Sequence, residues 1–187
     1  MRTSLVSEQD LASRCVLKDR EAQGELYARY AARLYAVCFR YLGDKEEAQD
    51  LMHDSMIKAM DCIGQFRFNG EGSLYSWLRR LTVNVAIDRL REMSRLRMVP
   101  LDSSMDSDIP EQDDDVDKIP ASVMLDMVAS LPSVRRTVFN MYCIDGYSHK
   151  EIAQAINITE KGSASILAKS RAQLRNAIND YLKRTGQ

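Results

Sequence analysis

The chain has 187 residues, of which 45% are hydrophobic and 28% are charged. This balance predicts one or two folded domains and excludes a disordered or fibrous chain. The mean hydropathy is -0.35, and no apolar run approaches the roughly 20 residues that cross a bilayer. The N-terminus turns acidic at Glu8, too early for a secretory signal, so we expect a cytoplasmic protein without membrane insertion.

The formal net charge of -1 hides an uneven distribution of charge along the chain. Residues 1–98 carry a net charge of +2, residues 99–120 of -7 and residues 121–187 of +4. Two basic blocks are therefore joined by an acidic one. Basic blocks favour a phosphate-bearing partner such as nucleic acid, although the total charge would argue against one.

The four cysteines, Cys15, Cys38, Cys62 and Cys143, are widely spaced and form no CxxC pair. We expect free thiols that pack as small hydrophobic side chains, with no metal, no disulfide and no cofactor.

The sequence of the first basic block, residues 1–98, predicts one helix after another. Apolar residues recur at helical spacing at Leu26, Tyr30, Leu34, Cys38 and Tyr41. Gly43 then breaks the helix and Asp44 can cap the next one. That helix carries a second apolar stripe and should end near Gly64; its members are Ala48, Leu51, Met52, Ser55, Ala59 and Ile63.

A glycine-containing loop over 64–72 leads to a long helix, which we expect from Leu74 to about Arg97 with Ser73 as its cap. Arg80, Asn84, Arg91 and Arg95 fall within about 60° on this helix. Arginine holds phosphates, and Asn can read a base edge. The aromatic residues Phe66, Phe68 and Trp77 could stack on an unpaired base. The alternative is that Trp77 belongs to the core and the arginines face water.

Residues 99–120 contain three of the four prolines, an acidic run and few large apolar residues. Such a composition buries too little surface to offset backbone entropy, so we interpret it as a linker. It separates an N-terminal domain, 1–98, from a C-terminal domain, 121–187.

The last block predicts helices at about 121–130 and 133–144, followed by a helix-turn-helix. Ser148 and Glu151 have the spacing of a capping box. Asn157 and Ile158 make a tight turn, and Thr159 can cap a second helix from Glu160. The sequence shows no strand-like alternation, so the predicted fold is all-α, with two small helical domains.

A helix-turn-helix places the start of its second helix in a major groove. We expect Gly162 to weaken this helix slightly while letting its backbone approach a phosphate. The exposed candidates on the second helix are Lys161, Ser163, Ser165, Lys169 and Arg171. The alternative is a helical hairpin whose lysines are merely solvated.

Three motifs together resemble the bacterial RNA polymerase sigma factors of the sigma-70 family. The first is Gly43-Asp44-Lys45-Glu46-Glu47-Ala48-Gln49-Asp50-Leu51-Met52-His53-Asp54, which resembles their acidic helix. The second is Ser76-Trp77-Leu78-Arg79-Arg80, followed by Asn84, Asp88, Leu90 and Arg91. The third is Leu131-Pro132, then Gly146-Tyr147-Ser148-His149-Lys150-Glu151-Ile152-Ala153, then Arg171 and Leu174-Arg175. The short linker points to the two-domain extracytoplasmic-function (ECF) group.

The resemblance implies a function and its partners. It implies a non-enzymatic protein that binds core RNA polymerase and directs promoter-specific initiation. The N-terminal domain would be region 2, with Asp50, Leu51, His53 and Asp54 on the polymerase clamp. Minus-ten promoter DNA would be read and opened by Phe66, Phe68, Asn69, Trp77, Arg80, Asn84 and Arg91. The C-terminal domain would be region 4 and would read the minus-thirty-five element through Ser148, His149, Lys150, Thr159, Lys161, Ser163, Ser165, Lys169 and Arg171.

The resemblance further implies that the acidic linker runs toward the RNA exit path of the polymerase, and it leaves open whether an anti-sigma factor binds the chain. The chain departs from the family at Gly162, Ala164 and Ile166, so its upstream base contacts do not follow from the family. Asp50 and Asp54 could instead form a solvated acidic face, or bind metal together with His53.

Three rival functions make different demands on the sequence. An ordinary transcriptional regulator would need a ligand pocket or phospho-acceptor in 1–98. A nucleic-acid enzyme would need paired carboxylates or a metal-ligating set, whereas His53 and His149 lie in separate domains. A pure interaction protein would not need the six arginines near Asn84, which are Arg79, Arg80, Arg89, Arg91, Arg95 and Arg97.

Overall fold

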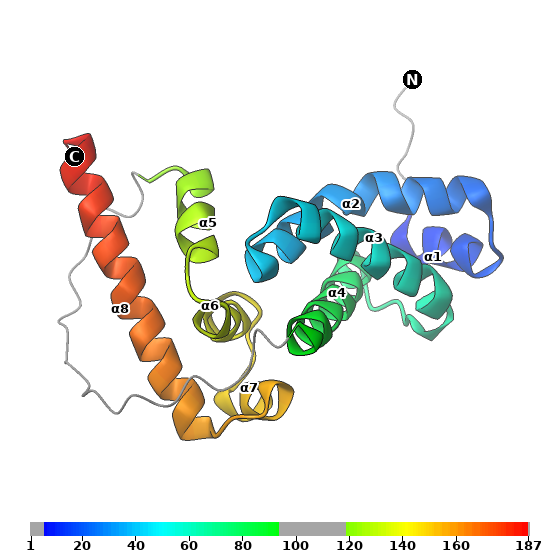
Figure 1. Cartoon of the computed structure of the whole chain (residues 1–187). Helices are drawn as coiled ribbons and strands as arrows, with labels where there is room; N and C mark the ends of the chain where they lie inside the picture. The colour runs from blue at the N-terminus through cyan, green and yellow to red at the C-terminus, as the bar shows by residue number, and fades with distance from the viewer. Residues whose placement is uncertain (1–5, 94–118, 187) are drawn as a thin grey trace. The chain divides into compact units, whose positions relative to one another are not determined.

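The computed structural model describes residues 6–93 and 119–186 (Figure 1). Within these two ranges the chain forms helices and no strand, which confirms the predicted all-helical fold. Most of the predicted acidic linker, residues 99–118, lies outside the described residues, as do Arg95 and Arg97. None of the described helices is long and apolar enough to cross a membrane.

The chain divides into two compact units. The first comprises residues 1–39 and 44–86, and the second comprises residues 40–43 and 87–187. The division by function into 1–98, 99–120 and 121–187 stays a prediction.

The first unit begins with a helix that the sequence analysis did not anticipate, α1 (Glu8–Val16). Its N-cap Ser7 accepts from the amide of Asp10 at 3.1 Å, and its buried side chains include Leu11 and Cys15. The next helix is α2 (Arg20–Leu42). Asp19 precedes it and caps it, because its Oδ1 accepts from the amides of Glu21 and Ala22. The stripe predicted for α2 is fully buried, at Leu26, Tyr30, Leu34, Cys38 and Tyr41.

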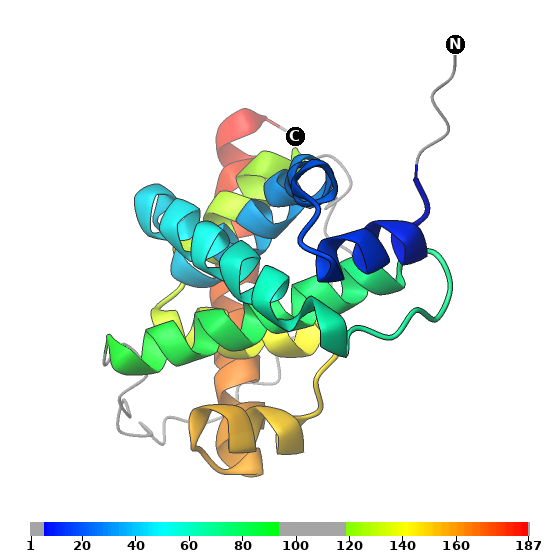
Figure 2. The same cartoon turned by 90° about the vertical axis from the view of Figure 1, so that its right-hand side faces the viewer.

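The helix α3 (Lys45–Cys62) begins where the sequence predicted, because Asp44 Oδ1 accepts from the amide of Glu47 at 2.9 Å. A short 3-10 turn, η1 (Ile63–Gln65), ends it. Figures 1 and 2 show α2 and α3 side by side. All six residues of the predicted stripe are buried: Ala48, Leu51, Met52, Ser55, Ala59 and Ile63.

The long helix α4 (Ser73–Glu92) starts one residue earlier than predicted. Ser73 is therefore its first helical residue and not its cap. The Ser73 hydroxyl instead accepts from the amide of Asn69 at 3.2 Å, which ties the preceding loop to the helix. The loop makes its turns at Gly70 (φ +91°) and Gly72 (φ +89°), a backbone conformation that glycine adopts without strain.

The second unit contains α5 (Ala121–Ala129), α6 (Ser133–Phe139), a π-helical turn η3 (Asn140–Ile144), α7 (His149–Ile156) and α8 (Glu160–Thr185). The prediction of one helix over 133–144 is thus correct except that its last turn is π-helical. Both α6 and α7 pack against α8. A hydrogen bond from Arg135 to Gln173 (2.8 Å) and one from Ser170 to the Arg135 carbonyl (3.2 Å) join α6 to α8.

All four cysteines are free thiols. Cys15 and Cys38 are buried, as expected, and burial raises the pKa of the Cys38 thiol to about 12. Cys143 contradicts the expectation of packed thiols because it is exposed, on the π-helical turn η3.

Candidate nucleic-acid and partner interfaces

The first candidate surface lies on α3. Asp50 and Asp54 are both exposed and stand one helical turn apart. Leu51, which we expected beside them, is only 2% exposed, because it belongs to the apolar stripe that holds α3 to its own unit. The structure therefore brings Asp50 and Asp54 together at the surface and leaves Leu51 in the core.

His53 lies between these two carboxylates in sequence and is half-buried. Its Nε2 is 2.9 Å from the hydroxyl of Tyr27 on α2, and the two rings stack with centroids 6.0 Å apart. This contact fixes the His53 ring against α2. Tyr27, itself 38% exposed, thereby joins the edge of the acidic surface.

Ile57 lies on the same face of α3 as Asp50 and Asp54, and the sequence pattern did not identify it as a site residue. Positions 50, 53, 54 and 57 follow helical spacing and share one side of the helix. Ile57 is 61% exposed, so a large apolar side chain stands beside the two carboxylates. The signal in the sequence was an apolar residue outside the buried stripe. Ile57 and the half-exposed ring of Tyr27 give this face apolar groups beside its charges, and protein–protein interfaces combine an apolar centre with a polar rim.

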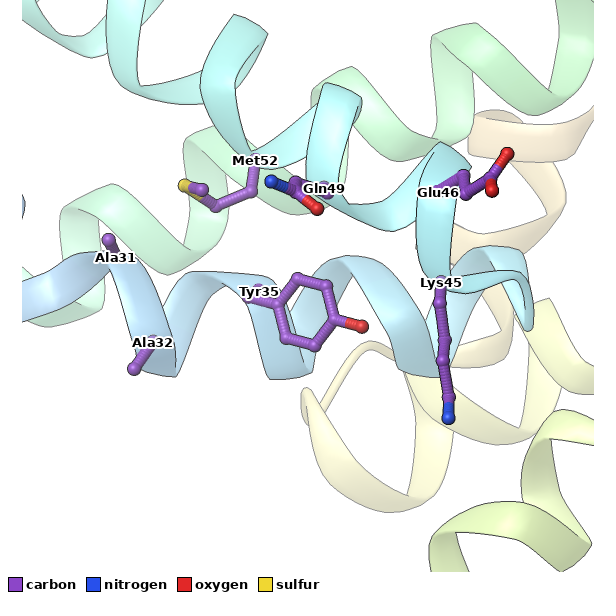
Figure 3. Close-up of a pocket in the computed structure, with 7 residues that line it drawn as sticks. All are labelled: Ala31, Ala32, Tyr35, Lys45, Glu46, Gln49 and Met52. Carbon is purple, nitrogen blue, oxygen red and sulfur yellow. The ribbon is translucent and has the colours of Figure 1, made fainter.

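A groove of about 480 Å³ runs between α2 and α3 (Figure 3). It is lined by Ala31, Ala32, Tyr35, Lys45, Glu46, Gln49 and Met52. The lining contains a single carboxylate and neither His nor Cys, which is too few ligands for a metal ion. Across the described residues, no group of three or more His, Cys, Asp or Glu side chains could hold a metal ion.

The second candidate surface is formed by the loop 66–72 and α4. Phe66 is 9% exposed and packs on Trp77, with ring centroids 5.9 Å apart and planes tilted by 57°. Phe68 remains 38% exposed, Asn69 is exposed and Trp77 is half-buried. Phe66 therefore packs against Trp77 and supports it, while Phe68 and Asn69 face the solvent.

Farther along α4, Arg80, Asn84 and Arg91 are all exposed. With 3.6 residues per turn they lie within about 40° of one another. Arg91 forms an ion pair with Asp88 at 3.0 Å, on the helix surface. The α4 surface, which we define as Phe68, Asn69, Trp77, Arg80, Asn84 and Arg91, thus combines phosphate-holding guanidiniums with an aromatic end.

Glu8 on α1 is a buried carboxylate at the start of α4, and no local sequence pattern indicates its burial. Its side chain is 5% exposed. One oxygen accepts from the Tyr30 hydroxyl at 2.8 Å and the other from the backbone amide of Leu74 at 2.9 Å. Burial, followed by the bond to Glu8, raises the pKa of Tyr30 to about 12, so its phenol stays protonated as a donor.

The third candidate surface is the helix-turn-helix of α7 and α8. The predicted capping box is confirmed: the Ser148 hydroxyl accepts from the Glu151 amide, and the Glu151 carboxylate accepts from the Ser148 amide at 2.8 Å. Asn157 closes α7 in the left-handed conformation (φ +56°), which Asn tolerates better than most residues. Thr159 caps α8 by accepting from the Gly162 amide at 2.9 Å.

One residue predicted to contact DNA, Ser163, lies inside this motif instead of on its surface, and a second, His149, is half-buried against it. Ser163 is 0% exposed, and its hydroxyl is 2.9 Å from Nδ1 of His149. The His149 ring also stacks on the ring of Tyr142, with centroids 4.4 Å apart. His149 and Ser163 therefore hold α7 to α8.

Gly162 also has a different role from the expected one. It is buried, so its backbone does not face outward toward a phosphate. A Cβ there would lie 3.0 Å from the Thr159 hydroxyl. Glycine thus leaves room for the cap of α8.

The outer face of α8 carries Lys161, Ala164, Ser165 and Ala168. Lys161, Ala164 and Ala168 are exposed, and Ser165 is half-buried. Of the remaining predicted contacts, Ser148, Lys150, Thr159 and Arg171 are exposed and Lys169 is half-buried. The start of α8 is thus a narrow, small-residue face with basic groups around it, which suits close approach to base edges in a major groove.

Comparison with known families matches both units of this chain. Residues 26–96 match Sigma-70 region 2, and residues 122–174 match Sigma-70, region 4. Together the two matches cover more than half of the chain. Helix α1 precedes the first match.

Curated relatives give the same family. The ECF RNA polymerase sigma factor SigE of Mycolicibacterium smegmatis is 27% identical over 87% of this chain, and the chain spans only 64% of that relative. The sigma-H factor of Pseudomonas aeruginosa is 27% identical over 96% of this chain and 98% of its own length. SigW of Bacillus subtilis, an ECF sigma factor, is 27% identical over 87% of this chain and 91% of its own.

Among solved structures, CnrH in complex with the cytosolic domain of CnrY is similar, with a TM-score of 0.47, 19% identity and coverage of 91% of this chain and 96% of that chain.

Proposed function

The chain belongs to the ECF sigma factors of the sigma-70 family, which direct promoter-specific transcription initiation and are not enzymes, and from this premise we propose how its surfaces divide that task. Residues 1–98 act as region 2 and residues 121–187 act as region 4, joined by the acidic segment 99–120. The observation that carries the proposal is the presence in one chain of an exposed Arg80–Asn84–Arg91 face and a fully capped helix-turn-helix.

Core RNA polymerase binds the outward face of α3. The carboxylates of Asp50 and Asp54 pair with basic groups of the polymerase clamp, and Ile57 supplies an apolar centre between Tyr27 and those charges. His53 contributes its ring, which the contact with Tyr27 holds in place at the edge of this face. This combination supports a specific protein contact, since interface centres are apolar and their rims are charged. Leu51 acts only from the core, by holding α3 in place.

The α4 surface binds and opens the minus-ten element. Arg80 and Arg91 hold phosphates, and Asn84 reads or caps a base edge. Trp77, supported by Phe66, stacks on an unpaired base together with Phe68, and Asn69 lies beside them as a polar contact. Stacking on an aromatic ring stabilises a single-stranded base by about 1–3 kcal/mol, which favours the opened strand over the duplex.

The helix-turn-helix binds the minus-thirty-five element as a duplex. Lys161 and Arg171 neutralise phosphates beside α8, with Lys150, Lys169 and the hydroxyls of Ser148 and Thr159 as further polar groups at its edges. The small outer face lets Ala164, Ser165 and Ala168 approach the bases, where an alanine methyl group suits the methyl group of thymine.

The proposed location is the cytoplasm, where core polymerase and promoter DNA are found. An anti-sigma factor is a candidate third partner, and no described residue identifies one. The proposal is tested by nuclease footprinting of core polymerase on promoter DNA with and without the chain. The expected result is protection at two separate elements only when the chain is present. Protection that core polymerase gives alone, or no protection with both, would refute it.

A further inference from the structure

The start of α4 carries the aromatic end of the α4 surface, so the contacts that fix this turn bear on promoter opening. A helix begins with backbone amides that have no partner within the helix. The amides of Ser73 and Ser76 donate to the loop carbonyls of Gly70 and Gly72. The amide of Leu74 donates instead to the Glu8 carboxylate, 66 residues earlier in the chain.

Glu8 is held for this contact from its other side. Its side chain is 5% exposed, and the oxygen that does not face Leu74 accepts from the Tyr30 hydroxyl at 2.8 Å. A negative charge at a helix N-terminus is favoured by the aligned peptide dipoles. Both carboxylate oxygens are thus engaged, and three helices, α1, α2 and α4, meet at one side chain.

We propose that Glu8 is a positioning residue for promoter opening. Through the Leu74 amide it fixes the first turn of α4 in the geometry in which the α4 surface holds an unpaired base. Trp77 follows Leu74 by three residues, so the two lie on adjacent turns of one helix face. The loop that ends at Ser73 is tied to the same turn by the Asn69 amide.

The proposal assigns part of region 2's work to a segment outside the region 2 match, which begins at residue 26. It rests on the proposed function, because it requires that the α4 surface opens DNA. It does not involve α3, where polymerase binding is proposed. The two steps, polymerase binding and strand opening, should therefore respond differently to changes at Glu8.

Three variants of the full chain separate the possible roles. Glu8→Ala removes both acceptors and leaves the Leu74 amide without this partner. Glu8→Gln keeps the shape, an oxygen for the Leu74 amide and an amide group that can donate to Tyr30. Asp10→Ala is the matched control, because Asp10 is an exposed acid in the same first turn of α1.

Each variant is assembled with core polymerase on a promoter that the unaltered chain uses, and strand opening is followed by permanganate reactivity of the thymines. Affinity for core polymerase and the thermal unfolding midpoint are measured alongside. Trp77 is the only tryptophan in the chain, so its emission spectrum reports directly on the start of α4.

The expected result is a loss of opening of about fivefold or more for Glu8→Ala, on the scale of a lost helix cap. Core affinity should be unchanged, and Trp77 emission should shift. Glu8→Gln should restore most of the opening, and Asp10→Ala should match the unaltered chain.

Equal opening by Glu8→Ala and Asp10→Ala would overturn the proposal. So would a parallel loss of opening and core affinity in Glu8→Ala, measured well below its unfolding midpoint, because that pattern indicates general destabilisation. If the unaltered chain fails to open any promoter with core polymerase, the proposed function itself fails.

Discussion

Nδ1 of His149 and the hydroxyl of Ser163 form a hydrogen bond of 2.9 Å that joins α7 to α8. Both residues had been predicted as DNA contacts from their positions in the helix-turn-helix. The buried Ser163 cannot reach a base edge, since its side chain is 0% exposed. Their shared role is to hold α8 against α7, which sets the orientation in which α8 meets the DNA.

Ser163→Ala and Lys161→Ala should therefore have opposite signatures. Ser163→Ala should lower the free energy of unfolding by about 1 kcal/mol, the net value of a typical hydrogen bond. It should leave the salt dependence of DNA binding unchanged. Lys161→Ala should preserve stability but reduce the slope of log affinity against log salt by about 0.9.

Urea unfolding and salt-dependent binding to duplex minus-thirty-five DNA measure the two effects. Ser122→Ala on the exposed surface of α5 is the control for stability. A reduced salt slope in Ser163→Ala would place Ser163 at the DNA and contradict this assignment.

Asp50→Arg should abolish stable binding to core polymerase while the fold survives, because Asp50 is exposed and its reversal places like charge against a basic partner. Co-purification with core polymerase and far-UV circular dichroism check the two halves of this prediction. The control is Asp126→Arg, which reverses an exposed acid on α5. Normal co-purification of Asp50→Arg would remove α3 from the proposed interface.

Arg80→Ala combined with Asn84→Ala should impair open-complex formation more than initial binding of the polymerase. The pair removes a phosphate contact and a base contact from the exposed side of α4, and each such contact contributes on the order of 1–3 kcal/mol. Permanganate footprinting reports opening, and gel-shift titration reports initial binding. Arg20→Ala, on the exposed start of α2, is the control. An unchanged footprint would show that this side of α4 does not open DNA.

Burial of the Tyr30 phenol, followed by its hydrogen bond to Glu8, predicts a pH dependence of stability in the alkaline range. The pKa of Tyr30 is raised to about 12 in the folded chain, above its ordinary value of 10.0. The stabilisation is therefore fully present below about pH 10 and is lost as the pH rises from about 10 to about 12.

Tyr30→Phe should be less stable than the unaltered chain near neutral pH, and the difference should shrink at about pH 11.5. Urea unfolding at the two pH values gives that difference. The other tyrosines are present in both proteins, so their contributions to the free energy of unfolding cancel. A difference that stays constant with pH would show that the Tyr30 proton does not take part.

The features that could be predicted from sequence are those set by neighbours in the chain. The Ser148–Glu151 capping box and the Asp44 cap depend on residues three positions apart, and both are confirmed. The buried stripes of α2 and α3 follow from helical periodicity alone.

Long-range contacts could not be predicted in this way. Glu8 reaches the amide of Leu74 only because α1 packs in the same unit as the start of α4, and no local pattern encodes that packing. Ser163 and Leu51 were assigned to surfaces by position, whereas their burial depends on which side of each helix meets a neighbour. The exposure of Ile57 was missed for the same reason.

The central claim is tested most directly by transcription with purified core RNA polymerase on genomic DNA, with sequencing of the transcript starts. The account predicts initiation at a defined set of sites that depends on the added chain. Starts should share two sequence elements, and Arg80→Ala with Asn84→Ala should reduce them. If the chain neither stimulates specific starts nor forms a stable complex with core polymerase, the proposed functions of residues 1–98 and 121–187 are contradicted.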